Sequence, residues 1–336
     1  MERKLYLLIL GALLIFFTSC FQEDEPVPPY VSPPGVTTNV AEIGPTYDKQ
    51  LFYDLETDSF VRVVNREVWD LAFQCLNGQY QVFINSSKLM RVANTLSINF
   101  NQNFTTTGLD WKYDNSGGWL DSTAIGEWGT VTENQVSSFN HVYIIDRGLA
   151  AGTGTNLGYK KMQILGFSNN QYSIRYANLD GSQLQQISFS KDPSYNFIFV
   201  SFDQGVVSVE PPKSTWDLLF TQYTAKVTQQ STGIVENYSV NGVLINTHNV
   251  KVAKEFSKPF TEILYTDLPN YIFTSQRDAI GYDWKEYNFN TASYIIYSNR
   301  SYLIQSVEEN YFKLRFISFT NQEGVRGYPT FEVVRF

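Results

Sequence analysis

Residues 69–73 read Trp-Asp-Leu-Ala-Phe, and residues 216–220 read Trp-Asp-Leu-Leu-Phe. The two pentapeptides lie 147 residues apart, and the same offset holds without a gap back to Leu51, which falls opposite Ile198. Alternation with period two is typical of a β-strand, so Trp, Leu and Phe are predicted to share one face of each strand. Burying such large apolar groups stabilises a fold by about 1.5–3 kcal/mol each.

The motif is predicted to be structural rather than catalytic. Trp69 and Trp216 are expected to anchor the core, and Asp70 and Asp217 are expected to accept hydrogen bonds near a sheet edge.

Other short segments recur in the same order in both parts of the chain. The matches pair 82–85 with 243–246, 124–126 with 279–281, 143–145 with 294–296, and 159–164 with 311–316. Runs of five to eight residues between Gly, Asn, Asp and Ser predict strands and turns throughout. The sequence therefore predicts an all-β protein of two tandem antiparallel β-sandwich-like domains, residues 47–182 and 190–336. One large sandwich with internal pseudo-symmetry is the alternative.

The first 20 residues have the pattern of a lipoprotein signal peptide. Arg3 and Lys4 precede an apolar run, and small residues precede Cys20. Cleavage at this box would leave Cys20 as the first residue, carrying lipid that anchors the chain to a membrane. An ordinary signal peptide with an incidental cysteine is the alternative.

Residues 21–46 are predicted to be a tether. Several prolines favour an extended, semi-rigid chain. The acidic cluster 23–25 is similar to the surface-export signal of lipoproteins in Bacteroidetes-type bacteria, and a plain solvated spacer is the alternative.

Composition argues against several classes of function. The net charge is −8, and no basic patch appears, so nucleic acid is not an expected partner. No phosphate loop, zinc motif or nucleophile elbow is present, and the chain has two histidines, so no enzyme activity and no catalytic residue are predicted. If Cys20 carries lipid, Cys75 has no disulfide partner and is expected to be a buried structural cysteine.

The motif strand and the segments around it resemble those of a known protein family. A Trp-Asp-Leu-Ala-Phe strand after a Leu/Phe-rich hairpin is similar to the HmuY-like lipoproteins of Bacteroidetes. The closing segments 294–296, 311–316 and 329–332 are similar to the last strands of that family. The resemblance covers most of residues 47–336, as two copies. It implies an all-β haem-binding protein on the outer membrane, exposed at the cell surface, which captures haem and delivers it to a TonB-dependent receptor.

Family members hold haem iron with a pair of His or a pair of Met side chains. The candidates in this sequence are Met90, His141 and His248. Met90 lies in a polar region that favours exposure, and Met162 is expected to point into the core. Imidazole and thioether groups both suit iron. The first domain could supply Met90 with His141, whereas the second offers His248 by itself. No metal other than haem iron is expected.

Two other functions remain open. The chain could be a surface module that binds a glycan or a protein and has lost haem ligation. Trp111, Trp119 and Trp128 would then form an exposed stacking platform, although a buried irregular loop is the alternative for that stretch. The chain could also be a structural accessory lipoprotein without a small ligand.

Overall fold

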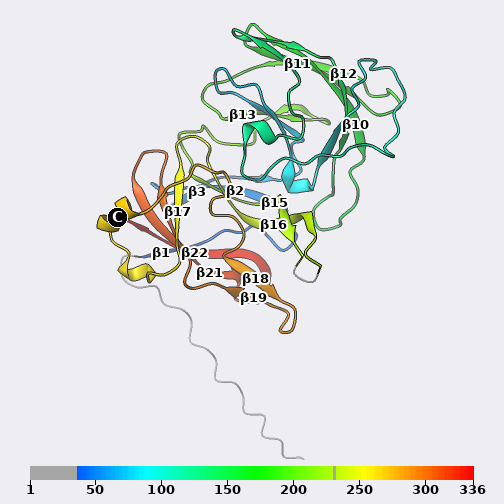
Figure 1. Cartoon of the computed structure of the whole chain (residues 1–336). Coiled ribbons are helices and arrows are strands. Elements are labelled where there is room, and N and C mark those ends of the chain that lie inside the picture. Colours follow the sequence, from blue (N-terminus) through cyan, green and yellow to red (C-terminus); the bar gives the residue numbers. More distant parts are fainter. Residues whose placement is uncertain (1–35, 230–231) are drawn as a thin grey trace, which may run out of the picture. The chain divides into compact units, whose positions relative to one another are not determined.

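The computed structural model describes residues 36–229 and 232–336, so the predicted signal peptide, Cys20 and most of the predicted tether lie outside the described residues. The described chain is built from antiparallel sheets with short 3₁₀ turns (Figure 1). The described residues cluster as one compact unit. The prediction of an all-β antiparallel fold is confirmed.

Four sheets account for most strands. Sheet A contains β1 (Thr37–Val40), β22 (Arg326–Arg335), β21 (Tyr311–Thr320), β20 (Ser301–Gln305) and β17 (Lys251–Glu255). Sheet B contains β16 (Val235–Ile245), β15 (Leu218–Thr228), β2 (Lys49–Asp54) and β3 (Ser59–Asn65). Sheet C contains β14 (Gly205–Val207), β13 (Phe197–Ser201), β4 (Leu71–Gln74) and β5 (Val82–Ile84).

Sheet D has the order β12 (Gln185–Ser190), β11 (Gln171–Ala177), β10 (Tyr159–Ser168), β8 (Gln135–Ser138) and β7 (Gly129–Thr132). Within it, β9 (Val142–Asp146) pairs with both β10 and β6 (Arg91–Asn94). A separate ribbon joins β18 (Lys285–Asn288) and β19 (Ser293–Ile296). The 3₁₀ turns are η2 (Ser86–Lys88), η3 (Leu120–Ser122), η4 (Phe260–Glu262) and η5 (Tyr265–Asn270).

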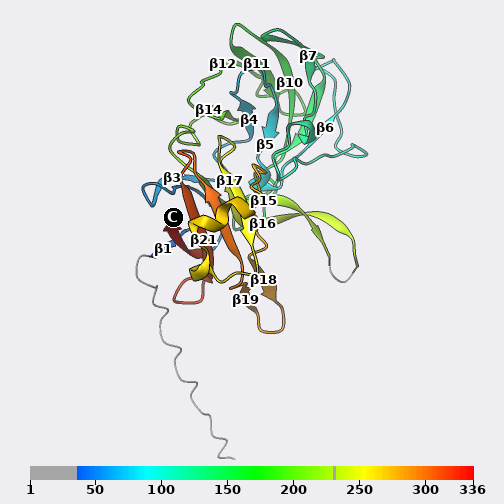
Figure 2. The same cartoon turned by 60° about the vertical axis from the view of Figure 1, so that its left-hand side comes forward.

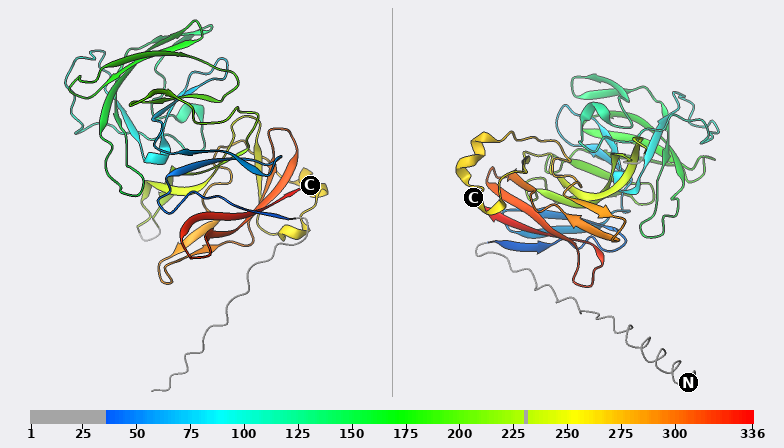
Figure 3. Two further views of the ribbon diagram at one scale, coloured as in Figure 1. Left: turned by 180° about the vertical axis from the view of Figure 1, so that it is seen from behind. Right: turned by 60° about the horizontal axis from the view of Figure 1, so that its bottom comes forward.

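The sheets stack in four layers. One apolar cluster lies between sheets A and B, a second between C and D, and a third joins B to C. Inner strands of sheets B and C, such as β4, are therefore buried on both faces, which explains the continuous apolar run at Leu71, Ala72 and Phe73. Figures 2 and 3 show the two inner sheets between the outer ones.

The two halves of the chain exchange hairpins. The β2–β3 hairpin comes from the first half but pairs with β15 of the second, with Leu51 opposite Phe220. The β13–β14 hairpin comes from the second half but pairs with β4 of the first, with Val200 opposite Leu71. The repeats predicted at 47–182 and 190–336 are thus not closed as separate sheets.

Two details of the sequence prediction need correction. Residues 37–46 belong to the fold rather than to the tether, because β1 pairs with β22 and Ala41 and Ile43 are fully buried. The match of 143–145 with 294–296 is also wrong in space. In the first half, β9 lies between β6 and β10. In the second half, β17 and β21 hold the corresponding places, and the strand between them is β20 rather than β19.

Candidate functional site

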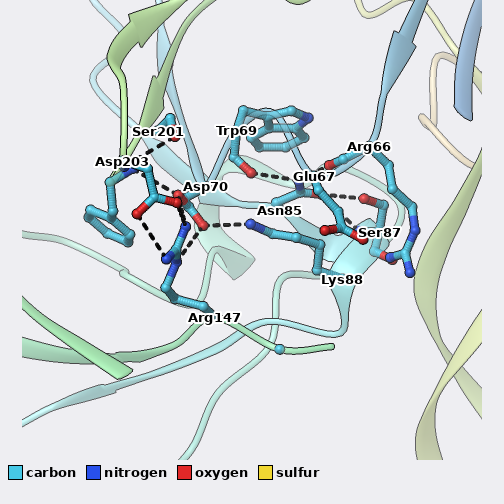
Figure 4. Close-up of polar contacts among 12 residues, drawn as sticks. Arg66, Glu67, Trp69, Asp70, Asn85, Ser87, Lys88, Arg147, Ser201 and Asp203 are labelled. Carbon is cyan, nitrogen blue, oxygen red and sulfur yellow. Dashed lines mark hydrogen bonds and ion pairs between the residues drawn. The ribbon is translucent and has the colours of Figure 1, made fainter. Parts of the chain in front are cut away.

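Asp70 lies at the centre of a buried ionic network (Figure 4). Its Oδ1 atom accepts from Lys88 Nζ at 2.5 Å, and both side chains have no solvent exposure. Arg147 contacts both carboxylate oxygens at 3.1 Å and also pairs with Asp203. The backbone N–H of Phe202 donates to Oδ2 at 2.8 Å. Burial opposes ionisation of Asp70, but the two cations outweigh it, so the net shift of its pKa is downward.

Asp217 has the same place in the second motif but no cation. Its two oxygens accept the backbone N–H groups of Leu55 at 2.8 Å and Val307 at 2.7 Å. No ion pair reaches it within residues 36–229 and 232–336. Burial, partly offset by these N–H groups, raises the pKa of Asp217 to about 6. Lys88 follows Asn85 by three residues, and the residue at the same distance from Asn246 is Asn249, which carries no charge.

The asparagines after the motif strands support each network in the same way. Asn85 donates to the carbonyl of Trp69 at 2.8 Å, and Asn246 donates to that of Trp216 at 2.7 Å. Each side-chain oxygen accepts the backbone N–H two residues later, at Ser87 and at His248. The asparagines that follow both motifs are thus held by backbone groups, which is a structural arrangement.

The prediction that Trp, Leu and Phe share one face is wrong. Leu71 and Phe73 face the cluster between sheets C and D, whereas Trp69 packs in the cluster between B and C. Trp69 precedes the paired part of β4, so the period-two pattern does not extend to it. Trp216 also joins the B–C cluster, with its ring 4.9 Å from that of Phe52.

The three haem-ligand candidates do not come together. Met90 is fully buried in the C–D cluster, so its expected exposure is wrong, while Met162 is buried as expected. Met90 and His141 flank opposite ends of the β6–β9 ladder, in which Arg91 faces Asp146 and Asn94 faces Tyr143. A strand of that length spans about 16 Å, which is too far for two ligands of one iron.

His248 lies half-buried in the turn after β16, in the other half of the chain. Burial and nearby Lys213 lower the pKa of His248, which favours the neutral ring. No exposed large apolar side chain flanks it within the sequence 246–250.

His141 lies half-buried at the start of β9. Its Nδ1 atom is 3.2 Å from Asn94 Nδ2, and its ring centroid is 5.7 Å from that of Phe139. Phe139 is 41% exposed and Leu96 is 70% exposed. His141 is therefore the candidate with apolar surface beside it.

The three tryptophans of 108–130 do not form a common platform. Trp128 is buried and donates from Nε1 to the carbonyl of Tyr80 at 2.8 Å. Trp111 is covered by the guanidinium of Arg91 at 4.6 Å. Trp119 is 53% exposed and stands without the other two.

A cleft of about 470 Å³ opens beside β15, β17 and the segment 272–283. The side chains lining it include Tyr223, Lys254, Asp278 and Tyr282. Sequence reasoning did not find this cleft, because its residues come from three separate segments and none belongs to a recognised motif. It contains no histidine or methionine.

Comparison with protein families gives one match, to the HmuY protein family, over residues 46–333. This chain belongs to the HmuY family. The match covers most of the chain and confirms the resemblance seen in the motif strands.

Comparisons with individual proteins are weaker. No curated protein matches. Apo PinO from Porphyromonas gingivitis aligns at 10% identity over 90% of this chain and 97% of its own, with a TM-score of 0.25. A protein described as HmuY-like and haem-binding, from Bacteroides vulgatus, aligns at 13% identity over 49% of this chain and 91% of its own, with a TM-score of 0.18. The apo HmuY analogue of Tannerella forsythia aligns at 14% over 47% and 86%, also with a TM-score of 0.18. Membership of the HmuY family therefore rests on the family match.

No cluster of three His, Cys, Asp or Glu side chains suited to a metal ion occurs in the described residues. Over the same part of the chain, no helix has the length and apolar character needed to cross a bilayer.

Proposed function

We propose that this protein is a surface lipoprotein that binds haem. In this proposal, Cys20 carries the lipid anchor in the outer membrane, and the haem is passed to a TonB-dependent receptor. The observation that carries the proposal is the HmuY family match over residues 46–333. The protein has no catalytic role in this proposal, because haem is cargo rather than a resident cofactor.

His141 is the side chain that we propose to contact the iron. It has exposed apolar neighbours, Leu96 and Phe139, against which a flat porphyrin face could pack. Imidazole is a common protein ligand of haem iron. Met90 and His248 fit less well, because Met90 is sealed in the core and His248 has no exposed large apolar side chain among residues 246–250.

The hydrogen bonds around His141 tune this site toward weak binding. The Leu96 N–H donates to Asn94 Oδ1 at 2.9 Å, which orients the Asn94 amide so that its NH₂ group faces His141 Nδ1. In the neutral ring, Nδ1 then accepts and the proton sits on Nε2. Ligation of iron through Nε2 requires that proton to move to Nδ1, where the amide opposes it. Modest affinity suits a protein that releases its cargo.

The test is a titration of the purified mature protein with ferric haemin, followed by the Soret band. The wild-type protein is expected to shift the band, and His141→Ala is expected to lose most of the shift. Asn94→Asp supplies a carboxylate that accepts from both Leu96 and an Nδ1–H, so affinity is expected to rise about 10–100-fold. His248→Ala and Met90→Leu are matched controls that should bind like the wild type. No wild-type shift would refute haem binding, whereas an unchanged His141→Ala would refute the ligand.

A further inference from the structure

The cleft beside β15 and β17 has a buried hydroxyl at its base. Tyr223 is 1% exposed, and its ring belongs to the B–C cluster. Its hydroxyl lines the cleft next to Gly281, with 3.8 Å between the oxygen and the position that a Cβ atom on this glycine would take. That hydroxyl makes no hydrogen bond within the part of the chain that the structure describes. Because Tyr223 lines the cleft and no hydrogen-bond partner in the described residues uses its hydroxyl, this group is available to a ligand.

The wall of the cleft carries a carboxylate without a cation. Asp278 accepts from Ser116 Oγ at 2.5 Å through Oδ2, and no ion pair reaches it in residues 36–229 and 232–336. Asp283, by contrast, is already paired with Lys254 at 3.5 Å and Arg300 at 2.9 Å. The carboxylate of Asp278 thus has an unused oxygen. Apart from the Coulombic attraction of the neighbouring Arg277, no cation of the described residues offsets its charge, so it is complementary to a ligand cation.

The rest of the lining is polar with one aromatic wall. Tyr282 is half-buried beside Asp278, and Thr274 and Gln276 add hydrogen-bonding groups. Aromatic rings attract cations to their faces and pack against flat apolar ring surfaces. Such a lining suits a ligand that combines hydroxyl groups, a ring face and a positive charge. The cleft offers no histidine or methionine for haem iron, so its chemistry differs from that of the site at His141.

We propose that the cleft binds an amino sugar. The ammonium group pairs with the Asp278 carboxylate, the sugar ring lies against Tyr282, and the Tyr223 hydroxyl hydrogen-bonds a sugar oxygen. This function is separate from haem binding and involves different side chains from those around His141.

The test is calorimetry on the full mature protein with three probes: the tetramer of glucosamine, the tetramer of N-acetylglucosamine, and tetralysine. Acetylation removes the ammonium charge but keeps the ring hydroxyls, and tetralysine keeps the charge without the sugar. The glucosamine tetramer is expected to bind at least tenfold more tightly than either of the others. Asp278→Asn should abolish that preference, and Tyr223→Phe should weaken the glucosamine tetramer several-fold.

Ser116→Ala is the matched control, because it removes the hydrogen bond to Asp278 while keeping the carboxylate. It should bind like the wild type, which separates loss of charge from loss of local structure. Equal binding of the acetylated tetramer or of tetralysine overturns the proposal, as does an unchanged Asp278→Asn or no binding of the glucosamine tetramer. Haemin titration of the same variants should stay unchanged, so failure here is distinguishable from failure of haem binding.

Discussion

The Nζ atom of Lys88 lies 2.5 Å from Oδ1 of Asp70, and neither side chain has any contact with solvent. This ion pair fixes η2 against the strand that carries the first motif. The second motif replaces it with Asp217, whose oxygens are held by backbone N–H groups. The aspartate of the same motif is therefore stabilised by cations in the first half of the chain and by backbone N–H groups in the second.

We expect Asp70→Asn to destabilise the protein by about 3–5 kcal/mol at pH 7, because Lys88 would be buried without its counter-ion. Asp217→Asn leaves no buried cation and should cost about 1–3 kcal/mol, the cost of a lost hydrogen bond in a buried site. Urea unfolding of both variants measures the difference. Equal losses would show that the ion pair does not set the stability of the first motif.

The second prediction concerns pH. Glu210 is buried and accepts from the Phe197 N–H at 2.9 Å, and burial raises its pKa to about 7, above its ordinary value of 4.5. A carboxyl group with a raised pKa in the folded state binds its proton more tightly there than in the unfolded chain. Its contribution to stability is therefore full below about pH 4.5 and is lost as the pH rises to about 7.

Glu210→Gln removes this titration and keeps an oxygen for the Phe197 N–H. The free energy of unfolding of the wild type, minus that of the variant, is expected to fall between about pH 4.5 and about pH 7. The slope should approach about 1.4 kcal/mol per pH unit near the middle of that range. A difference that stays constant with pH would contradict the raised pKa.

The third prediction follows from the exchanged hairpins. If residues 36–181 and 182–336 are expressed separately, neither is expected to unfold cooperatively, because β4 then lacks β13 and β2 lacks β15. Mixing the unfolded pieces and refolding them should restore a cooperative transition, followed by circular dichroism.

As a control, a protease site inserted at the exposed turn near Gly181 should allow cleavage of the folded protein. The two pieces are expected to stay together on size-exclusion chromatography. Independent folding of either piece, or separation of the cut pieces, would argue that each half closes its own sheets.

The sequence predicted where many strands lie, but it did not predict which strands pair with one another. Alternation and turn residues located strands such as β10 and β21, because those depend on local pattern. Which strand pairs with which depends on contacts between distant segments, so the exchange of β2–β3 and β13–β14 left no local signal. Met90 was misjudged for a related reason: its polar sequence neighbours say nothing about the core of sheets C and D that covers it.

The candidate sites show the same limit. His141 could be picked out by residue type, but the orientation of Asn94, which decides the protonated nitrogen, depends on a hydrogen bond to Leu96. The amino-sugar cleft could not be found, because Tyr223, Asp278 and Ser116 meet only in the folded chain. Nothing in the sequence indicated that Lys88 would pair with Asp70.

The exchange of hairpins also governs the order in which the chain can fold as it is made or exported. Strands β2 and β3 are synthesised or exported long before their neighbour β15, which begins at Leu218. The edge of β2 that pairs with β15 therefore stays open while the intervening chain emerges. Open edges invite pairing with other chains. Since pairings so distant in sequence form slowly, a chaperone that shields residues 49–65 until Leu218 arrives would raise the yield of correctly folded protein.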